Sequence, residues 1–399
     1  MSNINETQNK LLHVDGLRGV ACFMVVLSHL ALIFYPGLHD PSVYNNKFVS
    51  FIANGPLAFS YSGTAAVYIF FVLSGFILSH SFMKSGSLAS ALPNIATKRY
   101  FRLAIPATAS CIFAYFILSL FHPNTSTVPP WINFYATNNE TLIDAIYSGV
   151  VGSFFSQPAK VNPVLWTMKI ELIGSFLTYF LCIIISKAMR KWLILLLFSL
   201  AFFASQLPQH EKYGYISFIL GVWIYTCNFK IGIVFSAILI VFGIYFGGVH
   251  YGSYSYIRMI NYVRFFLNGE ESNAYYLFNF FSGFLICLVV LKNDYFVSFF
   301  SKKLFSFMGK VSFTVYLFHL PFIYLIGLST FNLLFTHGVK YVISVISSSA
   351  LSILSIYIAS MYLYRMIDHP SMRLSEKIAN IILNPVENKN ESAPHGQKK

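Results

Sequence analysis

Long runs of apolar residues recur along this chain and limit its possible folds more than any other feature. A helix needs about 20 mainly apolar residues to cross about 30 Å of hydrocarbon. Because lipid offers the backbone no hydrogen-bond partners, such segments cross it as helices. The pattern predicts an all-α fold, a polytopic transmembrane helix bundle of about ten spans. Ten runs meet or approach the required length: 18–36, 65–83, 103–122, 168–187, 191–207, 213–228, 231–249, 274–292, 312–332 and 341–365.

The charged residues support this interpretation. They make up 10% of the 399 residues, and hydrophobic residues make up 56%. A soluble domain of this size needs about 25% charged residues to cover its surface. About three in four of the Lys and Arg residues fall on one side of the alternating spans, which predicts that both termini are cytoplasmic. The same bias explains the net charge of +13 without a nucleic-acid partner.

The chain divides into one membrane domain and two tails. We expect an N-terminal cytoplasmic tail at 1–12, a transmembrane domain at 13–373 and a C-terminal cytoplasmic tail at 374–399. Within the last, 385–399 is polar and expected to be disordered. The stretch 142–157 is partly apolar and is expected to be interfacial or re-entrant. The first apolar run has no small-residue cleavage site after it, so we expect a retained first span.

The five cysteines all fall inside apolar runs and show neither CxxC nor Cys/His metal spacing. We expect unpaired thiols that pack as small apolar groups, with no metal site and no permanently bound cofactor. The larger outer loops, 37–64, 123–167 and 250–273, are candidates for an external substrate site.

The first span carries two ionisable residues at a helical spacing. Arg18 and His29 are eleven positions apart, about three turns, so they share one helix face and are separated by about 16 Å. An imidazole near the membrane middle is a functional candidate by default and suits proton transfer. The alternatives are a histidine bonded to a neighbouring helix and an arginine that anchors at headgroups. Asp15 is most simply an N-cap.

Two further segments carry candidate binding residues. Ser74 and Gly75 lie in the second span, where small residues usually serve helix packing. Arg99 and Arg102 share one face of a helix that precedes the third span. They are either positive-inside anchors or a grip on cytosolic phosphates, whose oxygens match the guanidinium fork.

The later spans carry polar residues of weaker signal. Trp166 and Glu171 begin the fourth span, and the carboxylate is expected about one turn inside the outer boundary, where it pairs with Lys169 or orients an acceptor. Tyr316 and His319 lie in the ninth span near a helix-bending proline. For His319, a structural hydrogen bond and a catalytic role are equally open.

Taken together, these residues resemble the membrane acyltransferase-3 family of multi-span O-acyltransferases. Five motifs occur in register over nearly the whole chain, which is specific where a single motif is not. The matching segments are His13-Val-Asp15-Gly16-Leu17-Arg18-Gly19 with the Arg-x10-His motif ending at His29, Phe71-Val-Leu-Ser74-Gly75-Phe76, Arg99-Tyr-Phe-Arg102, Leu165-Trp166-Thr-Met-Lys-Ile-Glu171, and Ser312-Phe-Thr-Val-Tyr316-Leu-Phe-His319 followed by Asp368-His-Pro370 and Arg373. One departure is Asp368, where family members often have Glu. The stand-alone members, without an appended esterase-like domain, are the most similar.

The resemblance implies transfer of an acyl group, most often acetyl from cytosolic acetyl-CoA as co-substrate, to a hydroxyl of a sugar in a surface or exported glycan. It implies an integral protein of the bacterial inner membrane, in contact with membrane lipids. Under this hypothesis Arg18, Arg99 and Arg102 bind the acyl-CoA phosphates. His29 acts as general base or as a transient nucleophile, and Glu171 serves the acceptor side.

Another class, a transporter or flippase of a glycan or lipid-linked intermediate, would also show ten spans with intramembrane His and Arg. Transporters usually show internal two-fold repeats, and none is evident between the halves of this chain.

Overall fold

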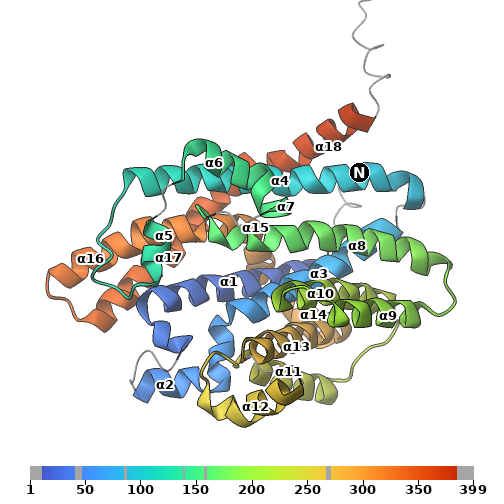
Figure 1. Ribbon diagram of the computed structural model, residues 1–399, viewed down its shortest axis with the longest axis horizontal. Helices are drawn as coiled ribbons and strands as arrows, with labels where there is room; N and C mark the ends of the chain where they lie inside the picture. Colours follow the sequence, from blue (N-terminus) through green and yellow to red (C-terminus); the bar gives the residue numbers. More distant parts are fainter. Residues whose placement is uncertain are drawn as a thin grey trace, which may run out of the picture.

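The computed structural model describes residues 11–40, 47–84, 88–137, 140–156, 160–266 and 271–383. Within these ranges every regular element is a helix and no strand is present, which confirms the all-α prediction for this part of the chain. Figure 1 shows the helices running side by side in an elongated bundle. The tail residues 1–10 and 384–399, including the expected disordered segment, lie outside the described residues.

Seven stretches of the described chain are long and apolar enough to cross a membrane. Their main helices are α1 (Leu12–Phe34), α3 (Gly63–Met83), α4 (Leu88–Leu120), α8 (Thr167–Lys187), α13 (Glu271–Lys292), α15 (Lys303–Phe322) and α17 (Tyr341–Leu363). Two of the stretches continue past their main helix through one-turn π segments. From α15, η7 (Ile323–Gly327) leads into α16 (Leu328–Thr336), and from α17, η8 (Tyr364–Asp368) leads into α18 (His369–Leu383).

The structure does not confirm the count of ten spans. The three runs that fall short form α9 (Lys191–Ala204), α10 (Gln209–Thr226) and α11 (Ile233–Gly247). With 14 and 15 residues, α9 and α11 extend about 21–23 Å, less than the hydrocarbon thickness. The first turn of α10 is polar, which lowers its hydropathy. The cytoplasmic placement of both termini stays a prediction.

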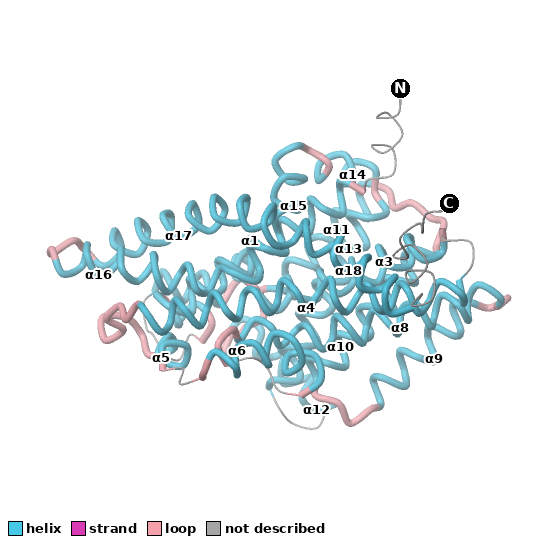
Figure 2. The backbone as a smooth tube through the Cα atoms, turned by 90° about the horizontal axis from the view of Figure 1, so that it is seen from above, coloured by secondary structure: helices cyan, strands magenta, loops and turns pink. Residues whose placement is uncertain are grey.

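Short helices fill the connections. Before α3 lie η2 (Pro36–Leu38), α2 (Lys47–Ala53) and η3 (Pro56–Tyr61), and after α11 lie η6 (Tyr254–Tyr256), α12 (Ile257–Phe266) and, beyond α13, α14 (Asp294–Phe300). Between α4 and α8 lie α5 (Trp131–Ala136), α6 (Leu142–Tyr147), η4 (Ser148–Gly152), α7 (Ser153–Phe155) and η5 (Pro163–Trp166). The apolar piece Leu142–Phe155 is too short to cross a bilayer, consistent with the predicted interfacial or re-entrant segment. Figure 2 shows α16 at one end of the bundle and α9 at the other, as does Figure 1.

Helix α1 crosses α15 in backbone contact. A Cβ atom added at Gly309 would lie 1.9 Å from the Asp15 carbonyl oxygen, and one at Gly19 would lie 2.6 Å from the Gly309 nitrogen. Only glycine allows this approach, because any side chain would separate the two helices. The crossing therefore places Asp15 and Arg18 of α1 directly beside Lys310 of α15.

The start of α8 is packed inside the bundle. Asn162 is fully buried just before η5, and its amide nitrogen donates to Ser110 Oγ (3.0 Å) on α4 and to the Leu317 carbonyl (2.9 Å) on α15. Glu171, one turn into α8, lies beside α3 and α4, where it contacts Ser74 and Arg99; its depth relative to the outer boundary stays a prediction.

Candidate functional site

A cavity of about 390 Å³ lies between α1, α3, α4, α8, α15 and the η8–α18 segment. Its polar lining is rich in charge. The basic side chains are Arg18, Arg99, Arg102 and Lys310, and the acidic ones are Asp15, Glu171 and Asp368. Cations therefore outnumber carboxylates around a space bordered elsewhere by apolar side chains.

Three of the four cations are weakly paired. Arg102 is exposed and makes no hydrogen bond or ion pair with any described residue. The nearest carboxylate oxygen to Arg18 is that of Asp15, at 3.8 Å. Lys310 lies over the Tyr364 ring, 5.2 Å from its centroid. Such cations are available to an anionic ligand, and Arg forks suit phosphate oxygens.

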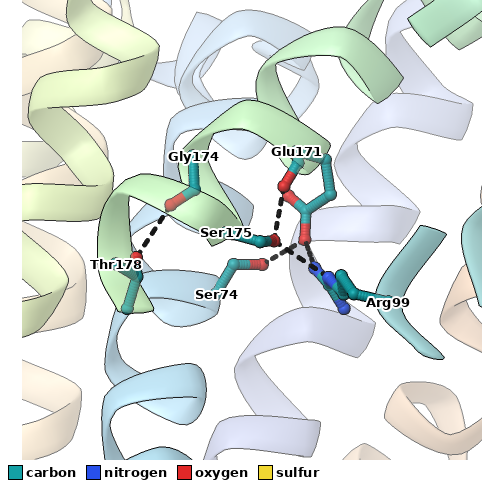
Figure 3. A network of polar contacts seen from close by, with 6 residues as sticks. All are labelled: Ser74, Arg99, Glu171, Gly174, Ser175 and Thr178. Carbon is teal, nitrogen blue, oxygen red and sulfur yellow. Dashed lines mark hydrogen bonds and ion pairs between the residues drawn. The ribbon is translucent and has the colours of Figure 1, made fainter. Parts of the chain in front are cut away.

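The fourth cation belongs to a fixed cluster, drawn in Figure 3. Arg99 of α4 forms an ion pair with Glu171 of α8, and its Nε donates to Ser175 Oγ at 2.9 Å. Ser74 Oγ of α3 donates to the same carboxylate oxygen at 2.7 Å. Both charged side chains are 13% exposed. Gly75 packs against the Phe218 carbonyl of α10, so the small residues of this motif have separate tasks: Gly75 permits helix contact and Ser74 bonds Glu171.

Beyond the cavity lies a pair of histidines whose hydrogen bonds define their tautomers. His319 is fully buried, and its Nδ1 lies 2.8 Å from the Tyr316 carbonyl oxygen, so this nitrogen carries a hydrogen. Burial favours the neutral ring, which leaves the lone pair on Nε2. That atom lies 3.1 Å from His29 Nδ1, which also faces the Val25 carbonyl at 3.0 Å. His29 Nδ1 thus donates, and His29 keeps its lone pair on Nε2.

Tyr316 separates the two parts of the site. It lines the cavity, and its hydroxyl donates to the Val164 carbonyl (2.8 Å) and lies 3.0 Å from Thr167 Oγ1. Its ring centroid lies 6.2 Å from that of His319. The cavity brings together the predicted residues Asp15, Arg18, Ser74, Arg99, Arg102, Glu171 and Tyr316, whereas His29, His319 and Trp166 do not line it. Trp166 contacts the His210 ring instead, with centroids 5.4 Å apart.

One residue next to the histidine pair, Trp131, was not predicted from the sequence. Trp131, the first residue of α5, is half-buried, and its ring centroid lies 5.8 Å from that of His29. It occurs in a long loop with no motif around it, so its only signal was an aromatic residue in an outer loop. Among the described residues, no group of three His, Cys, Asp or Glu side chains could hold a metal ion.

The seven apolar stretches and the polar site buried among them define an integral membrane protein of the multi-span class. Residues 11–365 match the family model for the acyltransferase domain, so the chain belongs to the acyltransferase-3 family. Membership confirms the resemblance seen in the motifs and favours the enzyme over the transporter. That it lies in the bacterial inner membrane stays a prediction.

The chain is similar to the O-acetyltransferase PaAT-1 of Phomopsis amygdali, with 28% identity over 201 residues. The match covers 42% of this chain and 40% of that protein. No solved structure matches the chain.

Proposed function

We propose that this protein is a membrane O-acyltransferase that moves an acyl group, most simply acetyl, from cytosolic acyl-CoA to a hydroxyl of a sugar or glycan acceptor. The observation that carries the proposal is the basic cavity at the start of α1, with the histidine pair beyond its end wall. CoA combines phosphates with a long uncharged arm and a terminal thioester. Arg18, Arg102 and Lys310 suit the phosphates, and the apolar lining suits the arm.

His29 is the proposed general base. Its Nε2 lone pair is free among the described residues, because Nδ1 is committed to His319 and Val25. His319 is then a positioning residue: it holds the His29 ring in one tautomer and orientation, as second groups commonly do for catalytic histidines.

The reaction balances without a cofactor. His29 Nε2 removes the proton from the acceptor hydroxyl while its oxygen attacks the thioester carbonyl carbon. The new C–O bond forms, the C–S bond breaks, and the proton passes from His29 to the departing CoA sulfur. An acyl-histidine intermediate is the alternative path to the same products.

Tyr316 lies between the cavity proposed to hold the donor and His29, the proposed base. The thioester has to pass beside this ring to come near His29, since the cavity ends at Tyr316 and Thr167. The hydroxyl is held at that position by its hydrogen bond to the Val164 carbonyl and by Thr167, so the ring is a fixed part of the cavity wall.

Glu171 is proposed to act through Arg99. Its carboxylate bonds both Arg99 and Ser74, so it fixes the guanidinium at the cavity wall. On the acceptor side, Trp131 presents an aromatic face beside His29, and such a face suits the apolar face of a sugar ring.

The test is acyl transfer from labelled acetyl-CoA in membranes that contain the protein and a glycan acceptor. We expect the His29→Ala variant to lose at least about 100-fold in transfer rate, the usual contribution of a general base. His122→Ala is the matched control, because His122 is an exposed histidine outside the site. Equal rates for the two variants at equal protein level would rule out His29 as the base. Absence of label transfer by the wild type would remove the proposed activity itself.

A further inference from the structure

A second, shallower hollow of about 200 Å³ lies on α18, next to the cavity. It is lined by His369, Pro370, Arg373, Leu374 and Lys377. The sequence motif that ends in Asp368-His-Pro with Arg373 contributes to it, and the proposed acyl transfer gives these residues no task.

The basic side chains of this groove are free to bind an anion. Arg373 and Lys377 are exposed and make no ion pair with any carboxylate in the described part of the chain. The nearby acid of α18, Glu376, is bound instead to Lys98 of α4 at 2.8 Å. Arg373 and Lys377 are four residues apart, so they share a face about 6 Å apart along the helix, and one phosphate group can contact both.

The groove and the cavity are lined by neighbouring residues of the η8–α18 segment. Asp368 and Met372 line the cavity, and the residues that follow each of them, His369 and Arg373, line the groove. A ligand that is anchored in the cavity and extends along α18 can therefore reach the groove residues.

We propose that this groove binds the 3′-phosphate of the CoA nucleotide, an inference that rests on the proposed function. CoA carries negative charge at two separate places, the pyrophosphate and the ribose 3′-phosphate. The arginines of the cavity serve the first place, and Arg373 and Lys377 serve the second. Pro370 and Leu374 supply an apolar wall for the adenosine. A lipid headgroup is the competing occupant, because exposed cations on helices also attract anionic lipids.

The experiment compares two donors in the purified full-length enzyme: acetyl-CoA and acetyl-3′-dephospho-CoA. We expect the R373A/K377A double variant to raise the KM for acetyl-CoA about tenfold or more, as loss of charge-assisted hydrogen bonds implies, with kcat unchanged. The same variant should leave the KM for the dephosphorylated donor unchanged, because that donor has no 3′-phosphate for Arg373 and Lys377 to bind. The matched control is K187A/R190A, which removes two exposed basic residues at the end of α8 and just before α9.

Each outcome decides the proposal. No change in KM for acetyl-CoA, or an equal rise for both donors, would overturn it. An equal loss of activity with both donors that is restored by adding vesicles of anionic phospholipid would overturn it in favour of a lipid site. If the wild-type enzyme uses neither donor, the proposed function is rejected. If the wild type uses both donors and the R373A/K377A variant has unchanged KM values, only the groove proposal is rejected.

Discussion

Replacing Glu171 with glutamine removes the charge opposite Arg99 while it keeps the size of the side chain and one oxygen that can accept from Ser74. In the wild type this carboxylate lies between the two partners, and the guanidinium has Ser175 as its other contact. After the substitution Arg99 stays charged in a confined space without its carboxylate. The variant therefore measures how much an unpaired, partly buried cation lowers the free energy of unfolding.

The burial of the pair sets the magnitude. Breaking a buried ion pair by removing one partner costs about 3–5 kcal/mol. Since each side chain is still 13% exposed, solvent screens the pair a little and the cost falls at the lower end of that range, about 3 kcal/mol. The Ser74 hydrogen bond weakens as well, because its acceptor changes from a carboxylate to an amide, and this adds about 1 kcal/mol. We expect a total loss in the free energy of unfolding of about 4 kcal/mol.

The assay is reversible unfolding of the purified protein in mixed detergent micelles. Glu376→Gln is the matched control, because it makes the same substitution opposite another basic residue of α4, Lys98. That pair is 32% and 61% exposed, so solvent screens it and its loss should have little effect. If Glu171→Gln and Glu376→Gln destabilise equally, the cluster around Glu171 does not carry the electrostatic energy assigned to it.

Two further predictions concern packing and pH. Gly309→Ala should strongly destabilise the bundle, because the new Cβ would collide with the Asp15 carbonyl, whereas Gly232→Ala, with open space around it, should be tolerated; equal melting temperatures would contradict the crossing. Burial lowers the pKa of His39 to about 3 and of His250 to about 4. Both rings are thus neutral in the fold and bind protons on unfolding below pH 6.5, so the free energy of unfolding should fall between pH 6.5 and 4. In His250→Phe this fall should be shallower, as followed by unfolding at a series of pH values.

The apolar runs predicted the fold class because the need to satisfy backbone hydrogen bonds in lipid leaves few choices. The length of an apolar run overestimated the length of the helix where the helix begins late or ends early. The run 191–207 gives α9, which ends at Ala204 before Ser205. The run 231–249 gives α11, which begins at Ile233 and has 15 residues. Composition alone does not specify where a helix begins and ends.

In the candidate site, relations within one helix could be predicted from the sequence, whereas contacts between distant residues could not. Helical periodicity could place Arg18 and His29 on one helix, because that relation is local. The pairing of Glu171 with Arg99 and of His29 with His319 depends on contacts between residues 72 and 290 positions apart, which no local pattern encodes. The position of Trp131 depends on how a long loop returns to the bundle.

Helix α1 is fastened to α15 at two places, by bare backbone contact near Arg18 and by the imidazole pair at His29. The offset of about 16 Å along the helix axis between Arg18 and His29 is consequently fixed, and thermal motion of the helices cannot easily shorten or stretch it. Adaptation to substrates of different length then has to come from the substrates' own flexible arms.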